Sequence, residues 1–415
     1  MHDQVIYSEK RFEELLAFSL GVMNGEDVKT LIDTYKETLD SVTPYDIVMI
    51  EDRQLQMGIK PDLIKVYLER IVNVITKSLN SYEWERPAEG TFLYYLMLEN
   101  DAFAFKLNQV KKIIKSYNGR EDADFEELRR ELLPHFLKFR DFEHHYVKKE
   151  NILFPYLEKV WEYYRPLKVM WSLHDDIRKT LKEVIALLEN EHTVWDDFKI
   201  LLGKYFFMAF RMIHKEDAVV YPIASETVDK KIWNKMHIQS FEYPFPFIEI
   251  PKMPQSDVDE TLSVADGVKD REIKSGVLSA MGRIITETGD LSVEQALIAF
   301  NHLPVEITIV DENDKVTFYN KADERFFPRS PAVVGRLVQN CHPPESVHVV
   351  EDIIEAFKTG KENKADFWIQ TRGKFILIQY FALKDERGNY KGVMEVSQDV
   401  TDIKKLEGEK RLLDW

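Results

Sequence analysis

The sequence contains one cysteine, Cys341, among 415 residues. A single cysteine excludes a disulfide within the chain and favours a reducing compartment. Long apolar runs are also missing, since no segment approaches the roughly eighteen consecutive apolar residues of a transmembrane helix. The first residues, MHDQVIYSEKRFEELL, lack the basic and then apolar pattern of a signal peptide. We therefore expect a cytoplasmic protein with no membrane contact.

Basic residues are in deficit: 56 Lys and Arg stand against 72 Asp and Glu, giving a formal net charge of -16. Such a surface repels phosphate backbones, which argues against nucleic acid as a direct partner. The chain also lacks a haem-attachment Cys-x-x-Cys-His, a Gly-rich phosphate loop, a nucleophile elbow and a kinase phrase. We therefore expect a protein without enzymatic activity.

The first half of the chain has the apolar spacing of α-helices. Residues 1–80 predict a small helical domain for packing or interaction, with one helix starting at Thr43-Pro44. Residues 88–230 predict an antiparallel four-helix bundle, with helices over 92–117, 124–160, 164–190 and 194–226. A length of 415 residues fits two to four domains, so further domains are expected after the bundle.

After the bundle, the spacing of apolar residues is no longer that of long helices. Residues 231–285 are rich in proline and charge and predict a linker, with its most flexible part at 255–275. Residues 286–404 predict an α+β module with a five-stranded antiparallel sheet, formed by strands at 306–311, 315–320, 365–370, 374–383 and 390–399. A helix capped by Ser346 precedes the third strand, and residues 405–415 predict a charged C-terminal helix.

Histidines and carboxylates gather in two similar phrases, each ended by a proline. HHYVKKENILFPYLE covers 144–158, and MIHKEDAVVYPIASE covers 212–226. His145 and Glu150 are five residues apart, off one ideal helical face but within reach of a long Glu side chain, whereas His214 and Asp217 are three apart. His174 lies on the third bundle helix. Carboxylates with imidazoles suit iron, manganese or zinc, so these residues are candidate metal ligands.

These phrases, with MWSLHDDIRKTL between them, resemble the hemerythrin HHE cation-binding domain. The whole chain resembles a prokaryotic family that joins an uncharacterised N-terminal helical domain, a hemerythrin-like bundle and a C-terminal PAS domain. The phrases LPVEITIVDENDKVTFYNKADERFFPRSPAVVGRLVQNCHPPESVHVVE and GVMEVSQDVTDIKKLEGEKRLL carry the PAS resemblance. The resemblance implies a non-haem iron site. Its expected ligands are His145, Glu150, His174, and Glu216 or Asp217, with His214 as a substitute ligand.

The chain departs from this family where further ligands are expected. Gly90-Thr91-Phe92-Leu93-Tyr94 replaces a Gly-His-Pro-x-His phrase, and Leu68-Glu69-Arg70-Ile71 replaces a Cys-x-x-His. Met170, Met212 and Tyr94 stand where imidazoles are expected. Too few ligands remain for two six-coordinate irons. Three alternatives stay open: two irons, one metal with water, or a bundle that has lost its metal and whose histidines are satisfied polar residues.

Cys341-His342-Pro343-Pro344-Glu345-Ser346-Val347-His348 is the most distinctive phrase of the PAS part. Cys341, His342 and His348 are candidate cofactor-binding residues, as an axial haem ligand or a redox-sensitive thiol. The alternative is a plain turn, in which the prolines end a strand and Ser346 caps the next helix. The PAS ligand is otherwise unknown.

Two functions follow from this organisation. The first is a cytoplasmic sensory or regulatory protein that couples the bundle to the PAS module and signals through a protein partner or as a homodimer formed by the PAS-flanking helices. The second is a non-haem iron protein for oxygen or NO scavenging, iron storage or repair. An enzyme that uses the bundle metal is the weakest alternative, because no acid–base pair or substrate pocket can be named.

Overall fold

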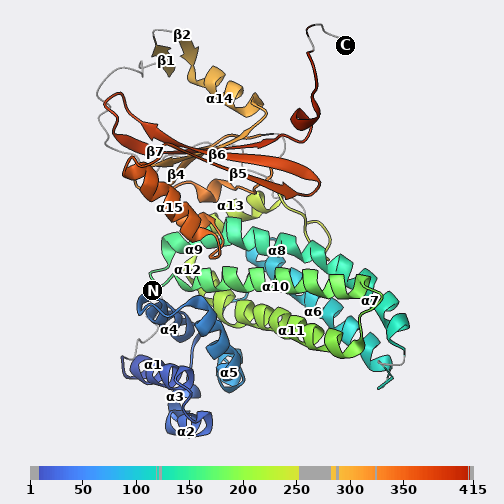
Figure 1. The fold of residues 1–415 in the computed structure, drawn as a ribbon. Coiled ribbons are helices and arrows are strands. Elements are labelled where there is room, and N and C mark those ends of the chain that lie inside the picture. The colour runs from blue at the N-terminus through green and yellow to red at the C-terminus, as the bar shows by residue number, and fades with distance from the viewer. Residues whose placement is uncertain are drawn as a thin grey trace. The chain divides into compact units, whose positions relative to one another are not determined.

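A computed structural model describes residues 9–117, 119–120, 124–251, 282–286, 289–322, 325–409 and 411, with side chains for all of these except 66–73 and 285. The chain forms two compact units. The first is Met1–Pro254 with Pro343–Glu345, and the second is Gln255–His342 with Ser346–Trp415. Figure 1 shows the first as helices and the second as a sheet with helices.

The first unit begins with short helices. Thr43 and Asp46 form a reciprocal capping box at the start of the fourth helix, in which Pro44 is the first residue. Pro at this position costs nothing because its missing N–H would have no helical partner. The five helices are α1 (Glu9–Met23), α2 (Val28–Thr34), α3 (Lys36–Leu39), α4 (Pro44–Gln56) and α5 (Pro61–Asn80).

Four long helical segments form the bundle, as the sequence predicts. Two are uninterrupted, namely α6 (Phe92–Ser116) and α10 (Pro166–Glu189). The second segment runs through α7 (Phe125–Phe139), η1 (Arg140–Phe142), α8 (Glu143–Lys148), η2 (Lys149–Leu153) and α9 (Phe154–Val160). The fourth comprises α11 (Trp195–Lys215), η3 (Glu216–Val220) and α12 (Tyr221–Thr227). Neighbouring segments pack against one another through α10 with α7 and α11, and α6 with α7 and α11.

The two histidine-containing phrases share one local distortion. Both η2 and η3 are π-helical turns, and each is followed by a proline at the second position of the next helix, Pro155 or Pro222. A proline has no N–H to donate to the carbonyl four residues earlier. A π turn has the wider i to i+5 pattern. It therefore brings residues five apart, such as His145 and Glu150, toward one face.

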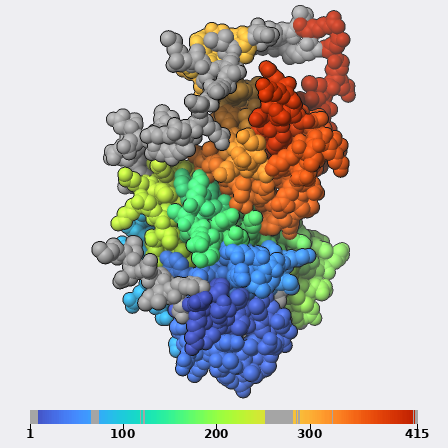
Figure 2. All heavy atoms as spheres, turned by 90° about the vertical axis from the view of Figure 1, so that its left-hand side faces the viewer, coloured from blue at the N-terminus to red at the C-terminus, as the bar shows by residue number. Residues whose placement is uncertain are grey.

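The N-terminal helices and the bundle share one hydrophobic core. Phe18, Ile47 and Leu79 belong to the same continuous cluster of buried side chains as Phe103 and Val184 of the bundle. Figure 2 shows the blue N-terminal residues and the green residues of the bundle packed side by side. Residues 1–80, which the sequence predicts as a domain of their own, therefore pack as one unit with the bundle.

The first part of the expected linker is ordered structure. Residues 230–240 form α13 (Lys230–Ser240), which packs on α6 and on η2. Trp233 and Met236 are buried, and so is Phe245 of the proline-rich stretch that follows. The prediction of a linker from residue 231 is wrong for this part of the chain. Burial of these apolar side chains against the bundle is more favourable in free energy than their exposure to water. The expected flexible boundary at 255–275 lies outside the described residues.

The second unit has a five-stranded antiparallel sheet in the order β4-β3-β7-β6-β5, and α15 (Val347–Lys358) lies against one face (Figure 1). Val310, Phe357 and Val393 are among the residues of its core. The strands β3 (Glu306–Asp311) and β7 (Tyr390–Asp399) have the predicted bounds. Of the other strands, β4 (Val316–Tyr319) and β5 (Lys364–Thr371) differ from prediction by one residue at each end, and β6 (Lys374–Lys384) by one residue at its C-terminal end.

Two features of the second unit differ from expectation. A small hairpin of β1 (Arg283–Thr286) and β2 (Gly289–Ser292), which the sequence did not suggest, precedes α14 (Val293–His302). The predicted C-terminal helix over 405–415 is absent from its described part: residues 403–405 form one 3₁₀ turn, and 406–409 are not helical. This stretch is exposed, so it has no apolar partner to stabilise a helix. Across the described ranges, no helix is long and apolar enough to cross a membrane.

Candidate functional site: a buried polar cluster in the helical bundle

Polar side chains replace apolar ones in one layer of the bundle core. Along α6 the buried positions Leu96, Asn100 and Phe103 are three and four apart, so Asn100 occupies a core position. His145 and Lys149, His174, and Glu216 take the corresponding positions on the other three segments. The buried polar cluster consists of Glu99, Asn100, His145, Lys148, Lys149, Glu150, His174 and Glu216, all of which are buried.

His145 lies between two carboxylates. Its Nδ1 atom is 2.8 Å from Oε2 of Glu99, and its Nε2 atom is 3.1 Å from Oε2 of Glu216. Its side chain is 0% exposed, and its ring stacks on that of Phe142 with centroids 4.5 Å apart. Both nitrogens are therefore occupied by partners within the protein.

Two lysine side chains enter the cluster and neutralise its acids. The ammonium group of Lys148 donates to Glu99, and that of Lys149 donates to Glu216. The Nζ atom of Lys148 also lies 4.1 Å from the ring centroid of Phe245, a cation–π contact that shields it from water. Each buried carboxylate so far described has its own cation, which is the condition under which buried charges are tolerated.

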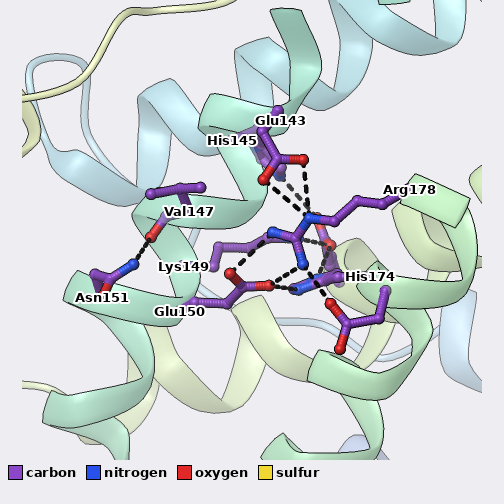
Figure 3. Close-up of polar contacts among 10 residues, drawn as sticks. Glu143, His145, Val147, Lys149, Glu150, Asn151, His174 and Arg178 are labelled. Atoms are coloured by element: carbon purple, nitrogen blue, oxygen red, sulfur yellow. Dashed lines mark hydrogen bonds and ion pairs between the residues drawn. The ribbon is translucent and has the colours of Figure 1, made fainter. Parts of the chain in front are cut away.

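The third carboxylate, Glu150, is paired in the same way. Its Oε1 atom lies 2.7 Å from Nδ1 of His174, and Nη2 of Arg178 donates to its Oε2 atom at 2.9 Å. Arg178 also donates through Nε to Glu143, at 2.9 and 2.8 Å to the two oxygens. Figure 3 shows the guanidinium group between these two carboxylates and His174 directed at Glu150. Among the described residues, the buried Nε2 atom of His174 has no hydrogen-bond partner.

Burial shifts the protonation equilibria of the cluster. It lowers the pKa of both His145 and His174 well below the ordinary value, and the positive charge of Lys149 acts in the same direction. These effects favour the neutral imidazole, which carries one N–H and can donate to only one of the two carboxylates beside His145. Burial raises the pKa of Glu99 to about 7, against the opposing charge of Lys148.

Glu216 has the surroundings of a carboxylate anion. Its Oε2 atom accepts from the Asn100 amide at 2.9 Å and from the Tyr221 hydroxyl at 2.9 Å, while Lys149 donates to its Oε1 atom. Donors that converge on one carboxylate favour its ionised form. The Lys149–Glu216 contact is a buried salt bridge that forms against the effect of burial, which lowers the pKa of Lys149 well below its ordinary value.

The structure brings together some of the predicted metal ligands and separates others. His145, Glu150, His174 and Glu216 belong to the cluster. Asp217 lies at its edge, where its Oδ1 atom accepts from Asn100 at 3.1 Å. His214 lies elsewhere, in the wall of a pocket between α11 and the N-terminal helices. His214 is two residues from both Met212 and Glu216, and residues two apart on a helix do not share a face.

Sequence reasoning missed the residues that balance the charge: Glu99, Lys148, Lys149 and Arg178. The sequence does indicate that one of them, Lys149, is buried. Lys149 continues the spacing Phe142, His145, Lys149, Ile152, which is that of a buried helical stripe. Nothing comparable distinguishes Arg178 from a solvated arginine on α10.

The predicted cofactor-binding residues of the second unit have three different environments. Cys341 is buried, and its thiol lies 3.6 Å from the carbonyl oxygen of Leu337. His342 is half-buried and donates through Nδ1 to the Val338 carbonyl at 2.8 Å, whereas His348 is exposed in the first turn of α15.

The fold and the site together define a class of protein: a helical unit with a polar bundle core, followed by an α+β module with a five-stranded antiparallel sheet. Comparison with known families gives the same division. The hemerythrin HHE cation binding domain matches residues 91–224, and the PAS domain matches residues 298–401. The chain therefore contains a hemerythrin HHE domain and a C-terminal PAS domain, preceded by an N-terminal helical region.

Several solved structures are similar to part of the chain. The C-terminal domain of a Streptococcus mutans protein is 36% identical, covers 31% of this chain and 100% of its own, and has a TM-score of 0.30. The PAS domain of a Colwellia psychrerythraea protein is 18% identical over 26% of this chain and 98% of its own, with a TM-score of 0.22. The BvgS PAS domain from Bordetella pertussis is 16% identical over 27% and 89%, with a TM-score of 0.23. No curated protein matches the chain.

The HHE domain implies a cation site, and the charges and donor atoms of the cluster can be compared with the needs of a metal ion. Lys148 and Lys149 place positive charge where a metal would have to bind Glu99 and Glu216. In the part of the chain that the structure describes, no group of three or more His, Cys, Asp or Glu side chains is arranged to hold an ion. A metal typically needs four to six ligands in total. The donor set therefore does not fit the iron expected from the sequence.

Proposed function

We propose that this chain is a cytoplasmic regulatory protein whose PAS domain receives a small-molecule signal and whose hemerythrin-like bundle is a metal-independent scaffold. One observation carries the proposal for the bundle: two lysine ammonium groups bind the buried carboxylates Glu99 and Glu216. An ammonium ion attached to the chain performs the charge-neutralising part of a metal ion without its Lewis acidity or redox chemistry. The proposal assigns the bundle no catalysis.

The proposed binding of a small molecule by the PAS domain rests on polar and charged groups inside that domain. Arg329 Nη2 lies 3.9 Å from Oε2 of Glu395, and both side chains are largely buried. Glu395 on β7 is the cross-strand partner of Tyr380 on β6. Burial lowers the pKa of His342, while the charge of Glu395 raises it. Arg329, Tyr380, His342 and Glu395 offer donors and an acceptor to a polar ligand.

Metal analysis tests this function. Protein expressed with added iron and purified anaerobically should hold far less than one metal ion per chain, and its spectrum should lack the bands of an oxo-bridged di-iron centre. A chelator should leave the unfolding midpoint unchanged. Stoichiometric iron that His145→Ala removes would instead support the second function, a non-haem iron protein for scavenging, storage or repair. A haem absorption band that His342→Ala abolishes would make haem the PAS cofactor.

The output of the proposed regulator is self-association through the segments that flank the PAS domain. On α14, Leu297, Ile298 and Phe300 are exposed, and beyond β7 so are Ile403 and Leu406. Association of these exposed apolar side chains with a second apolar surface is favourable in free energy. A second copy of the chain fits because it brings the same apolar surface.

Sedimentation equilibrium tests the dimer. The unmodified chain should be a dimer, and Ile298→Glu should shift it to the monomer, because the carboxylate would be buried at the interface. Ile200→Glu is the control, since Ile200 is 73% exposed on α11 and lies in the other unit. A monomeric unmodified chain at micromolar concentration would contradict self-association.

A further inference from the structure

The two edges of the PAS sheet differ in how well they are protected. At one edge, β4 has four residues and a register shift against β3, and the Val316 amide donates to the Arg336 carbonyl beyond the edge at 2.9 Å. At the other edge, β5 keeps one register with β6 over all eight residues, and among the described residues it pairs with no other strand. Short, irregular or covered edges resist pairing with another chain. The edge formed by β5 has less of this protection.

One hydrogen bond tells which residues of β5 face the open edge. The Ala382 amide donates to the Asn363 carbonyl at 2.9 Å, one step beyond the first pair of the β5–β6 ladder. Residues along an antiparallel strand bond alternately to the neighbour on one side and to the neighbour on the other. The odd-numbered residues of β5 therefore bond to β6. The residues whose backbone groups face the open edge are Lys364, Asp366, Trp368 and Gln370.

Apolar side chains are exposed on both faces of the sheet at this edge. Trp368 is 66% exposed, and Phe367 and Ile369 are each 38% exposed. Because successive side chains of a strand project to opposite faces, Trp368 lies on one face and the other two lie on the opposite face. Exposed apolar groups beside unpaired backbone groups favour the addition of another strand.

The order of side chains along this edge indicates which strand fits. The stretch KADFWIQTR, residues 364–372, has the same order of chemical character in both directions from Trp368: apolar, polar, small and basic. An antiparallel copy of the same stretch, centred on Trp368, therefore places apolar residues opposite apolar ones and Asp366 opposite Gln370. A two-fold interface needs this kind of self-complementarity. The partner that fits is a second copy of the chain.

We propose that β5 pairs with β5 of a second copy, antiparallel and with Trp368 opposite Trp368, so that the two sheets become one continuous sheet. Asp366, Trp368 and Gln370 form the hydrogen-bonded pairs, with about six backbone hydrogen bonds at two per pair. Phe367 then lies opposite Ile369 of the second copy in the closer, non-hydrogen-bonded kind of pair. This interface uses another element than the α14 surface, so it goes beyond the proposed function and does not depend on it.

The pairing should be weak. Eight residues from each copy are fewer than the roughly 20–30 residues per side of a stable interface. Lys364 also comes opposite Arg372 of the second copy, which places a like-charged pair at each end of the interface. We therefore expect association at about 100 μM and above, and not at micromolar concentrations.

Sedimentation equilibrium of the full chain with Ile298→Glu tests this interface, because that substitution removes the α14 surface. The variant should be monomeric at about 5 μM and largely dimeric at about 500 μM. Adding Trp368→Lys would put two ammonium groups opposite each other and should weaken association at least tenfold. Adding Ile200→Lys, at an exposed position of α11, should leave it unchanged. A variant that stays monomeric at about 500 μM, or a dimer that Trp368→Lys does not weaken, would overturn the proposal.

Disulfide formation tests the register. In a non-hydrogen-bonded pair the Cα atoms are about 4.5 Å apart, which is within the range of a disulfide. An oxidised equimolar mixture of Phe367→Cys and Ile369→Cys chains should give at least fivefold more cross-linked dimer than either variant alone. The unmodified chain controls for Cys341, which is buried. Equal yields from the mixture and from the single variants would show that the two strands do not meet with Trp368 at the centre.

Discussion

The Nε2 atom of His145 lies 3.1 Å from the Oε2 atom of Glu216, an oxygen that also accepts from Asn100 and Tyr221. His145 and Glu216 are two residues for which the family resemblance implies metal binding. Here they bind each other, and Lys149 supplies the positive charge on the other oxygen of Glu216. The hemerythrin-like bundle of this chain therefore keeps the ligand-bearing helices but pairs most of their polar groups internally, the buried Nε2 atom of His174 being an exception among the described residues.

Removal of one buried cation should be costly. Lys149→Met leaves Glu216 as an uncompensated buried anion, which should lower the free energy of unfolding by about 3–5 kcal/mol. The double variant Lys149→Met, Glu216→Gln should be less destabilised than Lys149→Met alone, because the charge to be compensated is gone. Urea unfolding followed by circular dichroism gives these values.

Lys199→Met is the matched control for this pair. Lys199 pairs with Asp196 on the exposed surface of α11, where such pairs contribute about 0–1 kcal/mol. A cost for Lys149→Met no larger than that of Lys199→Met would show that Lys149 is not a structural cation.

Asp217 should make part of the stability depend on pH. Burial raises its pKa from 3.8 to about 6. A carboxyl group with a raised folded-state pKa contributes stability that is complete below the unfolded pKa and is lost as the pH rises through the folded pKa. Between pH 5 and pH 8 this group should lose about 1.4 kcal/mol. The variant Asp217→Asn lacks this group.

Urea unfolding at both pH values measures the effect. Relative to the unmodified chain, Asp217→Asn should be about 1.4 kcal/mol more favourable at pH 8 than at pH 5. An offset that is the same at the two pH values would mean that Asp217 keeps an ordinary pKa. Asp196→Asn, at a solvated position of α11, should show no such difference.

Gly392 should not tolerate a side chain. It has a φ of +138° in β7, and a Cβ atom at this position would lie 2.0 Å from the carbonyl oxygen of Val310 on β3. Gly392→Ala should therefore separate these two strands and destabilise the PAS domain by about 3 kcal/mol or more. Hydrogen exchange of β3 and β7 should increase, while that of α10 should not.

Gly203→Ala is the control for Gly392. Gly203 is in the interior of α11, and an added Cβ would meet nothing within 4 Å. Alanine should stabilise the bundle by about 0.5–1 kcal/mol because it is the better helix former. If Gly392→Ala were tolerated as well as Gly203→Ala, the close approach of β3 and β7 would be wrong.

The side chain of Asn320 should hold the end of α14 and the start of β3 together in the PAS domain. Its Oδ1 atom accepts from the Ile307 amide at 2.7 Å, and its Nδ2 atom donates to the carbonyls of Phe300 and Val305 at 2.8 and 2.9 Å. Asn320→Ala leaves three backbone groups without this partner and should cost about 2–4 kcal/mol. Faster hydrogen exchange at Ile307 would confirm this, and unchanged exchange there would contradict it.

The sequence by itself determined the secondary structure and the two family domains. Helices and strands follow from local periodicity, so the bounds of β3 and β7 could be read directly. It also placed His145, His174 and Glu216 correctly on the inside, because a helical face depends only on spacing. His214 lies outside the cluster, in the wall of a pocket, since its spacing from Glu216 points it to another face.

Only the tertiary structure decided what the buried residues do. Glu99 and Lys148 are 49 residues apart in the chain, and Lys149 and Glu216 are 67 apart. Whether a buried acid binds a metal or an ammonium group depends on which charges meet in space, because electrostatic free energy depends on distance and burial rather than on sequence order. The same phrases that predict an iron site thus form internal ion pairs in this protein.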